Sequence, residues 1–77
     1  MIKPEQIRMA RGALKWGVRE LAEKTGLTAN TISRVENGAE SMASTLEKIR
    51  DALEAAGVEF IAENGGGAGV RLRGRQK

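Results

Sequence analysis

Residues 21–38 decide the fold, and they read LAEKTGLTANTISRVENG. Gly26 divides this stretch into two short helical segments, because glycine adopts the left-handed conformation that ends a helix at little cost. Thr28 follows as a good N-cap, and Ile32 and Val35 recur at a spacing that puts both side chains on one helix face. The pattern therefore predicts two helices that meet at a tight turn, at residues 18–25 and 28–37.

Two further helices are predicted before and after this pair. Pro4 suits a first helical position, and the apolar residues after it keep to one helix face as far as about Lys15. Ser44 and Glu47 have the spacing of a capping box, in which each side chain satisfies a free backbone amide at a helix start. Apolar residues then mark a fourth amphipathic helix, which Gly57 ends.

The pattern changes period after residue 57. Residues 58–63 suit a strand, residues 70–73 alternate with period two, and a glycine-rich run between them suits a hairpin turn. A two-stranded hairpin is marginal in water and has to pack on something. The predicted fold is mainly α, with a four-helix domain at 1–57, a β-hairpin at 58–73 and a frayed tail at 74–77.

The composition excludes several classes of function. The 77 residues include no cysteine, histidine or tyrosine, which removes disulfides, thiolate metal sites and a histidine general base. No apolar run approaches the roughly 20 residues of a membrane span, and the N-terminus has no apolar signal core. We therefore expect an intracellular, cytoplasmic binding protein that is not an enzyme and uses neither a metal nor a cofactor.

Charge is segregated along the chain. Residues 1–34 carry seven basic against three acidic residues, residues 35–63 carry two basic against seven acidic, and residues 64–77 carry four basic residues and no acid. A molecule polarised in this way suits a polyanion on one side only. The alternative is that charges are spread for solubility, which usually gives less segregation.

The chain resembles the phage repressor/Cro-type, or XRE-like, helix-turn-helix family at residues 21–28 (LAEKTGLT) and 31–38 (TISRVENG). The likeness extends over roughly residues 4–57. It implies a lambda-repressor-like domain in a sequence-specific regulator that binds double-stranded DNA, usually as a homodimer on a palindromic operator. A repressor of transcription is the favoured interpretation. The alternative is an antitoxin of a toxin–antitoxin pair that also binds its own promoter.

The resemblance assigns base reading to the start and outer face of the third helix. Side chains there are short or form hydrogen bonds, and an α-helix fits the major groove. Arg34 can donate two hydrogen bonds to guanine O6 and N7, and Asn30 can pair with adenine N6 and N7. The alternative for Arg34 is a solvated charge or a partner of a nearby glutamate, and the alternative for Asn30 is an ordinary surface side chain. The residues expected to read bases are Ala29, Asn30, Thr31 and Arg34.

Phosphate contacts fix the register of such a domain on DNA. In the family, the second helix often starts with a glutamine that bonds phosphate, preceded by a serine or threonine cap. This chain departs from that pattern with Val18 and Gly17, so Arg19 is expected to do more of the anchoring. The expected phosphate contacts are Lys15, Arg19, Thr28, Ser33, Asn37 and Gly38.

Arg11 lies with Arg8 and Lys15 on one helix face, which resembles a basic DNA-binding stripe. In the family, however, the matching arginine commonly pairs with the glutamate at the end of the third helix, here Glu36. We therefore expect a structural ion pair between Arg11 and Glu36, partly buried and costly to break from one side.

The hairpin is the expected dimer contact. Phe60 and Ile61 are adjacent and point to opposite faces of a strand, so one face can cover the fourth helix while the other lacks a cover. A symmetric copy of the chain is the commonest solution, and the alternative is a singly exposed Ile61. The expected interface residues are Phe60, Ile61, Val70 and Leu72.

The basic residues at the end of the chain have two interpretations. They could add a second phosphate contact outside the helices, or they could only balance the acidic fourth helix. The residues concerned are Arg71, Arg73, Arg75 and Lys77.

Overall fold

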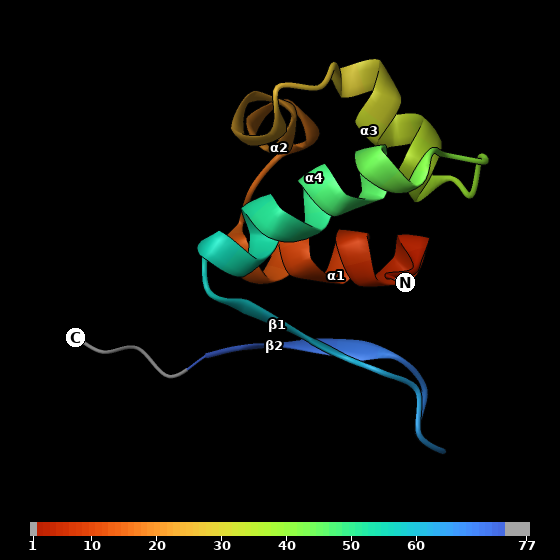
Figure 1. The fold of residues 1–77 in the computed structure, drawn as a ribbon. Coiled ribbons are helices and arrows are strands. Elements are labelled where there is room, and N and C mark those ends of the chain that lie inside the picture. The colour runs from red at the N-terminus through yellow and green to blue at the C-terminus, as the bar shows by residue number, and fades with distance from the viewer. Residues whose placement is uncertain (1, 74–77) are drawn as a thin grey trace.

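The computed structural model describes residues 2–73 of the chain, and it contains four helices followed by an antiparallel hairpin. In Figure 1, α2 and α3 lie on one side of α1 and α4, and the hairpin crosses the opposite side. The predicted mainly α fold is confirmed, while the expected tail at 74–77 lies outside the described residues. The elements are α1 (Pro4–Leu14), α2 (Val18–Thr25), α3 (Ala29–Glu36), α4 (Ala43–Ala55), β1 (Val58–Ile61) and β2 (Gly69–Leu72).

A single core joins the four helices to the first strand. Every helix and β1 contributes at least one fully buried apolar side chain, and burial of each stabilises the fold by about 1.5–3 kcal/mol relative to exposure. Ile32 and Val35 of α3 are among the buried residues, as their spacing predicted. The largest fully buried side chains are Ile7, Leu21, Ile32, Ile49, Leu53 and Val58.

The turn between α2 and α3 is fixed by hydrogen bonds at both helix ends. Gly26 has φ +77° and donates its N–H to the Ala22 carbonyl, a conformation that favours glycine. Thr25 donates its hydroxyl back to the Leu21 carbonyl at 3.0 Å. Thr28 then caps α3, since its side-chain oxygen accepts the Thr31 N–H at 3.1 Å. Local side chains therefore set where α3 begins.

The start of α4 differs from the prediction. The helix begins at Ala43 with Met42 as its N-cap, so the predicted capping box of Ser44 and Glu47 is wrong. The Met42 carbonyl accepts the N–H groups of Thr45 and Leu46, which places Ser44 inside the first turn, where its hydroxyl cannot act as the cap. The spacing of Ser44 and Glu47 alone therefore does not locate the start of this helix.

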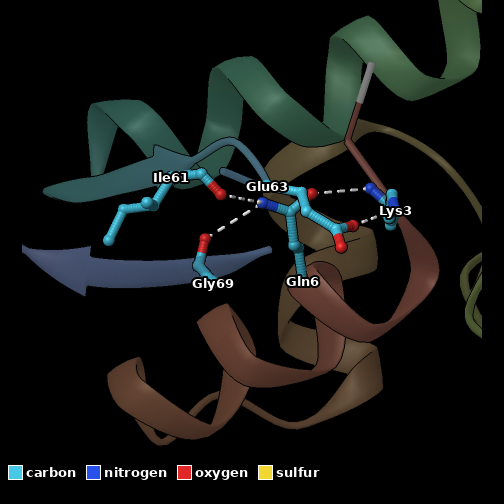
Figure 2. A network of polar contacts seen from close by, with 5 residues as sticks. All are labelled: Lys3, Gln6, Ile61, Glu63 and Gly69. Atoms are coloured by element: carbon cyan, nitrogen blue, oxygen red, sulfur yellow. Dashed lines mark hydrogen bonds and ion pairs between the residues drawn. The ribbon is translucent and has the colours of Figure 1, made fainter. Parts of the chain in front are cut away.

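The hairpin is attached to α1 by a buried glutamine. The side-chain nitrogen of Gln6 donates to the carbonyls of Ile61 at 3.1 Å and Gly69 at 3.0 Å, which are paired residues of β1 and β2 (Figure 2). Its Oε1 accepts the backbone N–H of Lys3 at 2.9 Å, as the third residue of a capping box does. One carboxamide thus holds both strands to the start of α1, beside an exposed ion pair of Lys3 with Glu63.

Replacing this glutamine should loosen the hairpin. Gln6→Ala leaves two strand carbonyls without their donor, and we expect a loss of about 1–3 kcal/mol in the free energy of unfolding. Hydrogen exchange of the β1 and β2 amides should accelerate more than that of α2. The control Lys3→Ala removes only the exposed ion pair with Glu63 and should cost about 0–1 kcal/mol. Equal losses from the two variants would contradict the role assigned to Gln6.

Candidate nucleic-acid interface

The outer face of α3 is open to solvent. Asn30 and Arg34 are exposed and lie one helical turn apart, so their side chains project from the same face. The opposite face of the same helix is anchored by the buried Ile32 and Val35. The other three expected contacts on this helix, Ala29, Thr31 and Ser33, are half-buried along its flanks.

The end of α3 is fastened to α1 by a bidentate ion pair. Arg11 donates from Nε to Oε2 of Glu36 at 2.7 Å and from Nη2 to Oε1 at 2.9 Å. A third hydrogen bond from Nη1 reaches the Trp16 carbonyl at 3.1 Å. The hydrogen bonds to Glu36 raise the pKa of Arg11 although partial burial opposes this, so the guanidinium stays charged. The ion pair that the family resemblance implies is therefore present.

A second arginine of α1 caps the same helix end. The Arg8 guanidinium donates to the backbone carbonyl of Glu36, one of the carbonyls that lack a partner within the helix. A cation here also complements the negative end of the helix dipole. Arg8 had been grouped with a possible DNA-binding stripe, and sequence alone gave no sign of this partner, which lies 28 residues away.

The chain leaves α3 through a glycine turn. Gly38 has φ +89°, and its N–H bonds the Val35 carbonyl at 3.0 Å while the Ala39 N–H bonds the Arg34 carbonyl at 3.0 Å. This pair of bonds is a Schellman motif. Asn37 precedes it as the exposed C-cap. The Gly38 amide is therefore engaged within the turn.

Hydroxyl groups at the start of α3 are also partly engaged. Thr28 donates its hydroxyl to Oγ1 of Thr31 at 2.9 Å while its own oxygen serves as the cap. The Thr31 hydroxyl accepts that bond and keeps its own proton to donate. Of the two threonines, Thr31 is thus the better placed to donate a hydrogen bond to an external acceptor.

The expected phosphate-binding cations remain accessible. Lys15 ends α1 in the left-handed conformation with φ +60°, and Arg19 lies in the first turn of α2; both are exposed. Neither forms an ion pair with another residue in the range 2–73. The Gly17 cap of α2 supplies no side-chain bond, and Val18 packs against the core, in agreement with the departure from the family pattern.

A cleft lies between α3 and the chain that follows it. It has a volume of about 230 Å³ and is lined on the α3 side by Asn30, Thr31 and Arg34. Glu40, Ser41 and Met42 line it from the loop before α4, together with Thr45. Three of the four residues expected to read bases therefore share one concavity.

The hairpin places three of its four expected interface residues on the face that meets the helices, since Leu72 pairs with the buried Val58 and Phe60 pairs with Val70. Phe60 and Val70 are paired across the strands and pack against the core, whereas Leu72 is 46 % exposed. Ile61 lies on the outer face, because neighbouring strand residues alternate. Of the four expected interface residues, Ile61 therefore belongs to the outer face, while Leu72 is the exposed end of the inner face.

The two described arginines at the end of the chain have partners within the fold. Arg71 pairs with Glu59 at 2.7 Å on the outer face of the hairpin. Arg73 donates from Nη2 to the Glu54 carbonyl at 2.8 Å, near the end of α4. The Arg73 contact reaches the acidic fourth helix, as the charge-balancing interpretation expects, whereas Arg71 pairs with a glutamate of β1 instead; Arg75 and Lys77 lie outside the described residues.

Neither a membrane-spanning helix nor a metal-binding cluster is present among residues 2–73. No described helix is long and apolar enough to cross a membrane. Residues 2–73 contain no cluster of three or more histidine, cysteine, aspartate or glutamate side chains that could hold a metal ion.

Breaking the α1–α3 ion pair from one side should destabilise the fold strongly. Arg11→Ala leaves the Glu36 carboxylate, whose side chain is only 7 % exposed, without its cation. We expect the free energy of unfolding in a denaturant titration to fall by about 3 kcal/mol. The double variant Arg11→Met, Glu36→Leu should recover much of this loss, since it leaves no buried charge. Arg71→Ala, which breaks an exposed pair, should cost less than about 1 kcal/mol.

Comparison with known proteins agrees with this geometry. A family model described as a helix-turn-helix domain matches residues 5–60, which run from α1 into β1. A search of curated proteins finds no significant match. Because the family model covers more than half of the chain, the chain belongs to the helix-turn-helix domain family, and this membership indicates a DNA-binding regulator.

Proposed function

We propose that the chain is a cytoplasmic repressor of the phage repressor/Cro, or XRE-like, type, which binds a palindromic operator in double-stranded DNA as a homodimer. The observation that carries this proposal is the arrangement of α3. Its inner face is buried, its C-terminal end is held by Arg8 and Arg11, and its polar face is exposed. A helix presented in this way fits the major groove.

Base recognition is assigned to the exposed face of α3. Arg34 has the geometry for two donors to guanine, and Asn30 for an amide pair with adenine. Thr31 has a hydroxyl proton free for an acceptor, and Ala29 offers a methyl group to thymine. No other residue in the range 2–73 forms an ion pair with Arg34, so its guanidinium is available for a base.

Phosphate anchoring is assigned to accessible groups on three helices. Lys15 and Arg19 supply positive charge from α1 and α2, and Ser33 and Asn37 supply neutral donors from α3. Such contacts fix orientation without reading sequence. Thr28 and Gly38, whose hydrogen-bonding groups are used at the two ends of α3, act by setting where the phosphate-contacting turns begin.

Dimerisation is assigned to the hairpin. Ile61 is the apolar side chain that the outer face offers to a second copy, with Phe60 and Val70 packed beneath it, and the exposed Leu72 lies at the edge of the inner face. The outer face also carries the Glu59–Arg71 ion pair, which can fix the register of two copies by pairing reciprocally across a two-fold axis.

Selection of bound sites from random duplex DNA tests the proposal directly. We expect a consensus of two inverted half-sites whose centres are separated by about one helical turn. Affinity for that site should fall steeply with salt, because each neutralised phosphate releases bound counterions. Enrichment of a single unrepeated site would contradict the proposed dimer. If no sequence is enriched from any pool, the proposed function is wrong.

Replacing Arg34 should alter specificity rather than general affinity. Arg34→Ala should lose about 1–3 kcal/mol of discrimination at one base pair in each half-site, measured by binding to single-base variants of the selected site. Arg19→Ala is the matched control. It should weaken binding to all sequences and lower the salt slope by about 1 for each subunit bound. If Arg34→Ala instead weakens all sequences evenly, Arg34 is a phosphate contact.

A further inference from the structure

The loop that faces Arg34 carries no basic side chain. Residues 39–42 read AESM and include no lysine or arginine. The Ser41 hydroxyl donates to the Ala39 carbonyl at 3.3 Å, so its proton is used within the loop. The Ala39 amide is likewise bonded to α3. A segment of this composition, placed beside the exposed face of α3, lacks side chains suited to a phosphate backbone.

Glu40 is the charged group of this loop, and the fold does not use its carboxylate. It is exposed, and it forms no ion pair or side-chain hydrogen bond with another residue in the range 2–73. Glu36, only four residues earlier, is buried against two arginines. Glu36 and Glu40 therefore differ in burial and in partners. Of these two carboxylates, that of Glu40 is available to an external partner.

The cleft brings Glu40 to the residues assigned to base recognition. Asn30, Thr31 and Arg34 line one wall of the cleft, and Glu40 lines the other with the exposed Met42. A duplex read by α3 would therefore also meet the Glu40 carboxylate. Phosphates and the guanine and thymine edges offer this carboxylate only acceptor oxygens or nitrogens, which repel it.

Resting on the function proposed above, we infer that Glu40 is a specificity-determining residue. Its carboxylate selects a base that presents an amino group in the major groove, cytosine N4 or adenine N6, beside the base pair read by Arg34. The amino group donates a hydrogen bond to the carboxylate. Guanine O6 or thymine O4 at the same place is an acceptor, so it would repel the carboxylate and form no hydrogen bond with it. Arg34 thus attracts acceptors, and Glu40 selects a donor at the adjoining position.

The competing role for Glu40 is a simple negative charge that weakens all DNA binding. The two roles differ in their dependence on sequence. A bulk charge changes affinity for every duplex by the same factor and changes the salt dependence. A base-selecting carboxylate changes the ranking of sequences at one position in each half-site.

The experiment is selection of sites from random duplexes by the full chain and by Glu40→Gln, followed by affinities for single-base variants. Glutamine keeps the size of the side chain but both donates and accepts, so it tolerates either kind of base edge. We expect the wild-type preference for cytosine or adenine at one position to fall by about fivefold or more. Glu47→Gln is the matched control, because this exposed glutamate of α4 does not line the cleft; it should leave every preference unchanged.

The outcomes separate the inference from the proposal beneath it. If the wild-type chain selects no site, both fail. If a site is selected and Arg34→Ala relaxes one position, but Glu40→Gln changes affinity evenly and relaxes none, only the role of Glu40 fails. Thermal unfolding of Glu40→Gln should match the wild type, since the carboxylate has no partner in the described fold.

Discussion

The position of the exposed helix depends on the ion pair between Arg11 and Glu36. Ile32 and Val35 give α3 a buried face, but apolar contacts are non-directional and would tolerate rotation or sliding of a helix this short. The bidentate pair adds direction, because a planar guanidinium and a carboxylate meet in one geometry. With Arg8 on the last carbonyl, the side chains on the outer face are held before any ligand arrives, which lowers the entropy cost of binding.

The arginines of the chain divide into those used by the fold and those left for a partner. Among the described residues, Arg8, Arg11, Arg50, Arg71 and Arg73 all donate to groups within the chain. Arg19 and Arg34 have no ion-pair partner in the described residues. The charge count along the sequence therefore overstated the basic surface: residues 1–34 are basic, yet two of their arginines serve to orient α3. The surface suited to a polyanion is correspondingly smaller and centred on α2, α3 and the end of α1.

Features that depend on near neighbours could be predicted from the sequence, and features that depend on distant ones could not. The turn at Gly26 and the Thr28 cap follow from residues within one helical turn of each other, and both are present. The start of α4 was mispredicted because the spacing of Ser44 and Glu47 matches a capping box that the chain does not form, while the helix begins earlier on the Met42 carbonyl without a side-chain cap. Gln6 contacts strands more than fifty residues later, which no local pattern around it reveals. The cleft that joins Glu40 to Arg34 is likewise created by tertiary packing.

Helix α1 connects the two surfaces to which the proposed function assigns partners. At its start, Gln6 holds both strands of the hairpin; about half a turn and about one and a half turns later, Arg8 and Arg11 hold the end of α3. In a dimer formed through the hairpin, the distance between two recognition helices is therefore transmitted through one rigid helix in each subunit. Because all three contacts are hydrogen bonds to backbone or carboxylate groups, they resist sliding more than apolar packing does. The spacing of two half-sites would thus be fixed by side chains that never touch DNA.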